Sequence, residues 1–387
     1  MADLKEIIEK GIEKYKRDRV GKISNPPLGN EIATKDAIRH FANGLGDPNP
    51  LWRDEEYAKN SPHGGLIAPP FFLNAVSESQ AITGLPGLIA TFVGSGWVWH
   101  RPIRVNDRFS VTNKLLELKD LPDSNGRRRL MQSGLLNYSN QRGELVGSCR
   151  WDMMRTEMKP GQAKRDSGGE ESVKNKYRHY SEEELAEIYA AVEREEIRGK
   201  SPRFFEDVNS GDELIPVVKG PLSLSDMVAW AIGISWHRIE LAHGMKLLHL
   251  RDNPGLSYID PDLGSPEPIA NSHFWPQAAK ILMGSSLPLD LGFQRVSWLG
   301  HLVTNWMSDF GFLRKLEARL KGLVQFGDTL WCAGKVAGKR KEEGKYLVDL
   351  ELWCRNQRDE ITTTGKAVVE LPAKTSFLNH TEEDNLR

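Results

Sequence analysis

The sequence predicts an α+β protein built as a tandem duplication, in which each half places helices ahead of a run of antiparallel strands. Short landmarks recur in the same order along the chain, and in both halves strand-like runs follow an apolar helix. A stretch rich in proline, glycine and charge separates the halves. An ordered internal repeat indicates one structural unit used twice.

Two kinds of turn carry the repeat. Asn-Gln-Arg-Gly-Glu at 140–144 and Asn-Gln-Arg-Asp-Glu at 356–360 each end a strand-like run, with Gly or Asp where a positive φ is tolerated. Upstream, Asn-Asp at 106–107 and Gly-Asp at 327–328 each interrupt an apolar run. Both pairs predict hairpin-type turns at matching places in the two halves.

Capping residues and apolar patterns predict the helices. An amphipathic helix is expected over 1–19, and short helices are expected behind Thr34 and Ser225. A longer apolar helix is predicted over 70–83, where it opens on proline and closes at a glycine, and another over 297–315.

Strands are expected after each long helix, at 89–100, 108–119, 127–140 and 144–155, and again at 316–326, 328–338, 345–356 and 360–371. We divide the chain into a first repeat at 1–158, a linker at 159–180, a second repeat at 181–372 and a tail at 373–387. Ser181 with Glu184 forms a capping box that opens a helix into the second repeat.

Composition excludes several classes of function. The 52 Lys and Arg balance 53 Asp and Glu, so no global charge favours nucleic acid or an anionic membrane surface. Mean hydropathy is −0.48 and no apolar run approaches the length of a membrane span. Cys149, Cys332 and Cys354 lack metal-ligand spacing and sit in apolar runs. We expect buried free thiols, no metal site, no secretory signal and a reducing cytoplasm.

Two segments resemble a known signature. Gly-Asp-Pro-Asn-Pro-Leu-Trp-Arg-Asp-Glu-Glu-Tyr-Ala at 46–58, followed by Gly-Gly-Leu-Ile-Ala-Pro-Pro at 64–70, is similar to the motif of the MaoC-like (R)-specific enoyl-CoA hydratase and dehydratase family. From about 20 to 372 the chain resembles the double-hotdog acyl dehydratases of that family. The resemblance implies a tandem double hotdog, in which one continuous antiparallel sheet wraps two long central helices.

The resemblance also implies a reaction. Members of the family add water to a 2-enoyl thioester, or remove it from a 3-hydroxyacyl thioester, on CoA or an acyl-carrier protein and without a cofactor. An Asp and a His of the motif loop act as acid and base, and a backbone N–H at the helix start stabilises the thioester oxygen. Asp47 matches the Asp, but Trp52 stands where the family has its His.

Two roles are therefore open for Asp47 in the first-half loop. Asp47 is either catalytic or, like Asn49, a turn former that bonds its own backbone. We expect Trp52 to fill the place of the imidazole in the first-half pocket, and the resemblance puts Asn49, Trp52 and Gly65 at the substrate.

The second half carries a degenerate version of the loop. Glu267 precedes His273 by six residues, which predicts an acid/base pair near the start of the second long helix. Alternatively, Glu267 is a solvated loop carboxylate and His273 is a buried, hydrogen-bonded loop histidine. Asp290, Gly292 and Arg295 lie where the family places its oxyanion-type donors, so Asp290 and Arg295 form either a structural ion pair or a substrate clamp.

The sequence is compatible with three functions. The first is a hydro-lyase acting on an acyl thioester. The second is a non-catalytic acyl-binding subunit paired with an active hotdog partner, and the third is a hotdog thioesterase, because a fold does not fix chemistry. The expected partners are the thioester itself and, in assembly, a second copy or another hotdog subunit.

Overall fold

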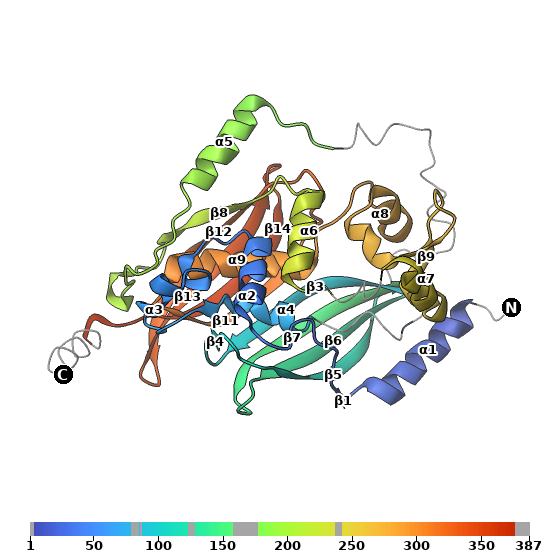
Figure 1. Ribbon diagram of the computed structural model, residues 1–387, viewed down its shortest axis with the longest axis horizontal. Coiled ribbons are helices and arrows are strands. Elements are labelled where there is room, and N and C mark those ends of the chain that lie inside the picture. Colours follow the sequence, from blue (N-terminus) through green and yellow to red (C-terminus); the bar gives the residue numbers. More distant parts are fainter. Residues whose placement is uncertain are drawn as a thin grey trace.

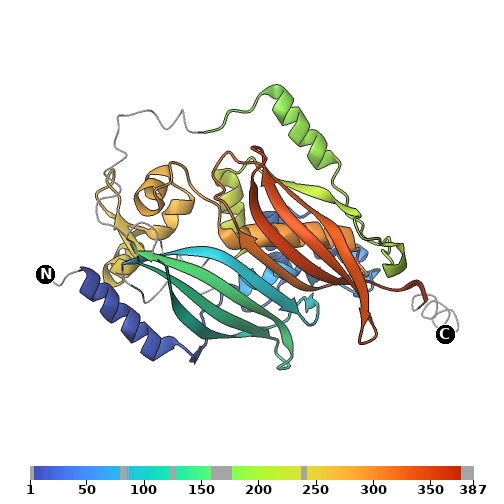
Figure 2. The same cartoon turned by 180° about the vertical axis from the view of Figure 1, so that it is seen from behind.

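The computed structural model describes residues 4–78, 85, 87–122, 128–157, 177–236 and 242–375 (Figures 1 and 2). Its main feature within these ranges is one 10-stranded antiparallel sheet of order β1-β5-β6-β7-β3-β11-β14-β13-β12-β8. The first half supplies β1 (Ile23–Ser24), β3 (Leu88–Trp99), β5 (Ser110–Leu121), β6 (Arg129–Ser139) and β7 (Leu145–Glu157). The second supplies β8 (Glu213–Lys219), β11 (Phe312–Leu320), β12 (Leu330–Glu342), β13 (Lys345–Asn356) and β14 (Ile361–Glu370).

The two halves join where β3 pairs with β11. The register places Lys315 opposite Val98 and Arg319 opposite Gly94. This seam confirms the expected continuous sheet. In Figure 2 the strands of both halves lie in front, with α9 (orange) and the lighter blue helices of the first half behind them, while α1 lies beside the sheet.

The second central helix is α9 (Gly292–Met307), and it is buried from Phe293 onwards. It begins and ends earlier than the range 297–315 predicted from sequence. The reason for its end is Ser308, whose φ of 68° and ψ of 174° turn the chain out of the helix. Its packing against both halves of the sheet confirms its central position.

The first central helix is much shorter than predicted. A 3-10 turn (Pro70–Phe72) leads into α4 (Leu73–Val76), and Ser77 is already extended. The prediction over 70–83 is therefore wrong, although 79–84 lie outside the described residues. The Ser77 carbonyl accepts a hydrogen bond from Tyr138 Oη at 2.6 Å. Where the helix ends, this carbonyl is therefore bonded to the sheet.

The short helices α2 (Lys35–Leu45) and α6 (Leu224–Gly233) pack directly on each other. Thr34 caps α2 as expected. The cap of α6 is Ser223 rather than Ser225, because Ser223 and Asp226 form a capping box. A Cβ at Gly44 would lie 2.6 Å from the Ala229 carbonyl oxygen, so this crossing requires glycine.

The repeated turns have the same geometry in both halves. The Asn140 side-chain oxygen accepts from the backbone N–H groups two and four residues later. Asn356 repeats both bonds. Gly143 and Asp359 have φ of 73° and 64°, as the turn requires. The duplication read from sequence is therefore visible in hydrogen bonds as well as in topology.

The remaining elements surround the sheet (Figure 1). They are α1 (Leu4–Arg19), α3 (Glu55–Lys59), β2 (Ile67–Ala68), β4 (Ile103–Arg104), α5 (Glu182–Glu193), α7 (His243–Asp252), β9 (Ser257–Ile259), β10 (Pro266–Pro268) and α8 (Pro276–Met283). The capping box of Ser181 and Glu184 opens α5 as predicted. Of the expected linker and tail, 158–176 and 376–387 lie outside the described residues.

The three cysteines are buried and free, as expected. Over the described ranges, no helix combines the length and apolar character needed to cross a bilayer.

The seam can be tested with a matched pair of glycines in β3. A Cβ at Gly94 would lie 2.3 Å from the Ala318 carbonyl oxygen, whereas a Cβ at Gly96 has its nearest neighbour at 3.9 Å. Gly94→Ala should lower the free energy of unfolding by about 1–3 kcal/mol through overpacking, and Gly96→Ala should be near neutral. Urea unfolding of the two variants measures this, and equal effects would contradict the β3–β11 register.

Candidate functional site

The motif loop is built on side-chain bonds to its own backbone. Helix α2 ends at Gly46, whose φ of 67° turns the chain toward the sheet. The Asp47 carboxylate accepts from the Asn49 N–H at 3.0 Å, and the Asn49 side-chain oxygen accepts from the Leu51 N–H at 3.0 Å. Both side chains thus make turn-forming bonds of the Asx type.

Trp52 closes this loop. Its indole Nε1 donates to the second carboxylate oxygen of Asp47 at 2.8 Å, and its side chain is 2% exposed. Trp52 lines a neighbouring cleft, but Asp47 is not part of that lining and is 1% exposed. The carboxylate in the family's acid/base position is therefore enclosed by the side chain that replaces the imidazole.

Two second-half side chains reach the same carboxylate. His301, on α9, places Nε2 at 3.5 Å from Asp47 Oδ1. Lys219, at the end of β8, places Nζ at 2.8 Å from His301 Nδ1 and donates to the Leu45 carbonyl at 2.7 Å. We call Asp47, Trp52, Lys219 and His301 the buried polar cluster.

Burial controls the charges of this cluster. Desolvation raises the pKa of Asp47 and lowers the pKa of Lys219. It also lowers the pKa of His301 well below its usual value, and the Lys219 charge adds to that effect. His301 is therefore a neutral imidazole that accepts from the lysine. Sequence reasoning missed His301 and Lys219, although an ionisable side chain within an apolar segment was a visible signal at both positions.

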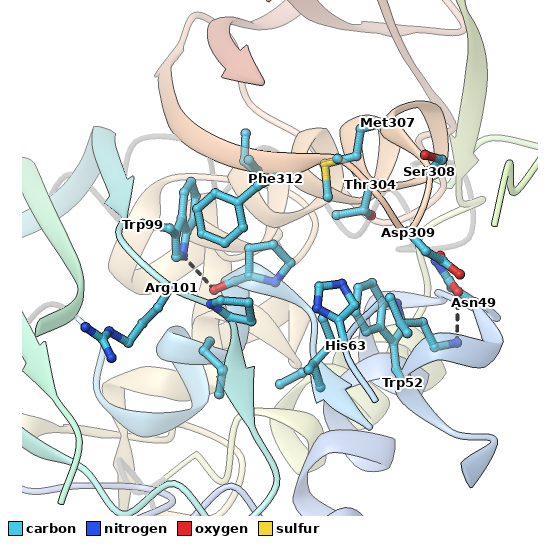
Figure 3. A pocket seen from close by; sticks show the side chains of 18 residues that line it. Asn49, Trp52, His63, Trp99, Arg101, Thr304, Met307, Ser308, Asp309 and Phe312 are labelled. Carbon is cyan, nitrogen blue, oxygen red and sulfur yellow. Dashed lines mark hydrogen bonds between the residues drawn. The ribbon is translucent and has the colours of Figure 1, made fainter. Parts of the chain in front are cut away.

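The cleft beside Trp52 lies between the two halves (Figure 3). The motif loop and the β2 and β4 regions line one side, and the segment from the end of α9 to the start of β11 lines the other. Trp99, Met307 and Phe312 give it apolar walls. Polar side chains enter it as well, among them Asn49, His63 and Asp309.

His63 and Asp309 are titratable groups of the cleft. Burial, aided by Arg104, lowers the pKa of His63. Burial raises the pKa of Asp309, and the Tyr57 hydroxyl opposes this by donating to its carboxylate at 2.8 Å. The pKa of Tyr57 is raised in turn by burial and by Asp309.

Two prolines stand at the start of the first central helix. Pro69 and Pro70 have no N–H, and the Pro70 carbonyl accepts from Trp99 Nε1 at 2.9 Å. Gly65, the predicted substrate contact, has open space around its α-carbon. The first half thus presents no amide donors at the two proline positions.

The second-half candidates lie in a separate region, near the start of α9. His273 Nδ1 is 3.0 Å from the Leu289 carbonyl oxygen, which places the ring beside the segment that leads into this helix. The Glu267 carboxylate accepts from Lys246 Nζ at 2.5 Å and from Asn271 Nδ2 at 3.1 Å. The carboxylate is thus held by Lys246 of α7 and by Asn271, four residues further along the chain.

Asp290 and Arg295 form a buried ion pair. Arg295 Nε lies 2.6 Å from Asp290 Oδ2, and both side chains are almost fully buried. The guanidinium also donates to the Gly322 carbonyl at 2.7 Å. A Cβ at Gly292 would lie 2.7 Å from Phe92. The ion pair expected from the sequence is therefore present, and a role of Asp290 and Arg295 at the substrate stays a prediction.

Comparisons with known proteins agree with this fold. A family model described as "FAS1-like, dehydratase domain region" matches residues 22–148. A UPF0336 protein of Parafrankia sp. is 34% identical over 126 residues, which cover 30% of this chain and 79% of that protein. A probable enoyl-CoA hydratase alpha subunit of Thermomonospora curvata is 26% identical over 166 residues, and the match spans about half of it (52%).

Solved structures match over nearly the whole chain. A MaoC-like dehydratase superposes with a TM-score of 0.61 at 16% identity, covering 92% of this chain and 99% of the other. A Mycobacterium tuberculosis protein described as having a double hotdog fold gives 0.58 at 11% identity, covering 92% and 97%. The chain belongs with the UPF0336 proteins by sequence, and it has the double hotdog fold of the MaoC-like dehydratases. The family model that matches the first half is described as a dehydratase region, which agrees with hydration and dehydration chemistry in general.

Replacing Trp52 tests the closure of the motif loop. Trp52→Phe removes the indole N–H, so one carboxylate oxygen of the buried Asp47 loses its hydrogen bond. The free energy of unfolding should therefore fall by about 1–3 kcal/mol. Trp275→Phe, at a tryptophan that is 56% exposed, is the control and should change little. Urea unfolding of both variants decides, and equal stabilities would show that the Trp52–Asp47 bond contributes nothing.

His301 predicts a pH dependence of stability. Because the folded pKa is depressed, the unfolded chain takes up a proton below about pH 6.5 while the folded chain does not. Stability should therefore fall as the pH drops through this range, with a contribution of up to about 1.4 kcal/mol per pH unit. Unfolding measured from pH 7.5 to 5 should show this slope reduced in His301→Gln. The exposed His179→Gln is the control, and an unchanged slope in His301→Gln would contradict a buried neutral imidazole.

Proposed function

We propose that the protein hydrates a 2-enoyl thioester, or dehydrates a 3-hydroxyacyl thioester, carried on CoA or an acyl-carrier protein. The observation that carries the proposal is the cleft between the halves. The motif loop lines it with Asn49 and Trp52, and titratable side chains enter it from both halves.

The character of the cleft suits this substrate class. Elimination of water needs a base at the α-carbon and an acid at the β-oxygen, in a site that excludes bulk water. Apolar walls at Trp99, Met307 and Phe312 suit an acyl group, and a few polar groups among them suit its reacting end. The enoyl-CoA named for the Thermomonospora curvata relative supports a thioester.

A second candidate function rests on Trp52. With the imidazole absent and Asp47 enclosed, the chain would bind an acyl thioester and leave the chemistry to an active hotdog partner. This candidate predicts binding without turnover by the isolated chain, as a homodimer or alone.

A panel of 2-enoyl-CoAs of different acyl size separates these functions. We expect the purified chain to hydrate at least one member, seen as loss of enone absorbance. Free thiol released without loss of the enone would indicate a thioesterase. Binding without any turnover, on CoA and on acyl-carrier thioesters, would favour the non-catalytic subunit and contradict the proposal.

His273 and Glu267 stay a prediction of the second-half alternative. If they are the acid/base pair, His273→Ala should lower kcat by about 10²–10⁴-fold with the fold intact. A near-normal kcat in His273→Ala would exclude the second-half loop as the catalytic site. The cleft between the halves would then be the remaining candidate.

A further inference from the structure

We propose that His63 and Asp309 are the catalytic base and acid of the cleft, and that they perform the proton transfers for which the motif loop has lost its imidazole. The inference rests on the proposed function and names residues outside the family motif. It assigns the chemistry to one site made by both halves of the chain.

The two side chains come from opposite halves and line the same cleft. His63 belongs to the loop between α3 and β2, and Asp309 lies two residues beyond the end of α9. Figure 3 shows the His63 ring beside Trp52 and the Asp309 carboxyl beside Asn49. A substrate entering between the halves would therefore meet an imidazole and a carboxyl.

The loop that carries His63 is fixed by its backbone. The His63 N–H donates to Ser61 Oγ at 3.2 Å, and the His63 carbonyl accepts from Arg104 Nη1 at 2.8 Å. The Asp309 backbone lies near the imidazole and favours its protonated form, against the opposing effect of burial. The first half therefore fixes the backbone of His63, and the ring meets the second half at the Asp309 backbone.

The strained backbone of Ser308 positions Asp309. Ser308 has φ of 68° and ψ of 174°, a region occupied almost only by glycine, and such strain concentrates at active sites and ligand clamps. The strain is held in place from outside: the Asp309 N–H donates to the Gly199 carbonyl at 2.9 Å, and the Arg203 N–H donates to Ser308 Oγ at 3.3 Å. Tyr57 then orients the carboxylate.

The environments suit opposite roles. His63, with its pKa lowered by burial and by Arg104, is neutral at pH 7 and can accept a proton. Asp309, with its pKa raised by burial against the opposing effects of Tyr57 and Lys200, keeps its proton to higher pH. Two titratable groups whose pKa values are shifted in opposite directions by their surroundings are typical of a catalytic acid and base.

The step balances without any co-reactant. In dehydration His63 takes the α-proton, and the electron pair of that C–H bond forms the double bond to the β-carbon. The β-carbon–oxygen bond breaks, and Asp309 gives its proton to the leaving hydroxyl, which departs as water. A proton then passes from the imidazolium to the carboxylate through solvent and restores both groups. Hydration is the reverse.

Substitutions in the full-length chain test the pair. On the enoyl-CoA that the wild type hydrates best, His63→Gln and Asp309→Asn should each lower kcat by about 10²–10⁴-fold. Each should also remove one limb of the pH profile of kcat/KM. His100→Gln, at a histidine that does not line the cleft, is the matched control, and thermal unfolding checks that all variants fold.

The outcomes separate the two proposals. If the wild type is active and His63→Gln keeps its kcat and both limbs of its profile, the pair is wrong and the proposed function stands. Loss of activity in His273→Ala alone would assign the chemistry to the second-half loop. A wild type without turnover on every thioester would overturn the proposed function and the pair together.

Discussion

The pairing of β3 with β11 is the constraint on which the rest of the structure depends. Because β11 follows α9 closely along the chain, its register on β3 fixes where the end of that helix lies. The end of α9 then faces the motif loop of the other half and closes the cleft. Asp309 reaches Tyr57 and Lys219 reaches the Leu45 carbonyl across the same boundary. The site is a consequence of joining two repeats in one sheet.

The exchange of an imidazole for an indole has a simple physical meaning. An indole N–H can only donate, so Trp52 can hold the Asp47 carboxylate but can neither take up nor deliver a proton. The motif loop keeps its turn-forming bonds and its place in the fold, while the group suited to proton exchange near neutral pH is gone. His301, neutral and buried, does not replace it, because it lies beside Asp47 and does not line the cleft.

Sequence reasoning succeeded where the determinants are local. The Asn140 and Asn356 turns, the capping box at Ser181 and the strand runs depend on residues a few positions apart, and all are present. It failed on the first central helix, because that helix ends where Tyr138 binds the Ser77 carbonyl from a distant strand. The buried polar cluster was missed for the same reason, since β8 and α9 meet the motif loop only in the folded chain. The catalytic roles of Asp47, Glu267 and His273 stay predictions.

The central claim is that the reacting end of an acyl thioester lies in the cleft between the halves. A crystal structure of the full chain with an unreactive thioether analogue of the best 2-enoyl-CoA tests it most directly. The account predicts that the α- and β-carbons lie between His63 and Asp309, with the acyl group against Trp99 and Phe312. An acyl group bound beside His273, with the cleft at Trp52 empty, would contradict it.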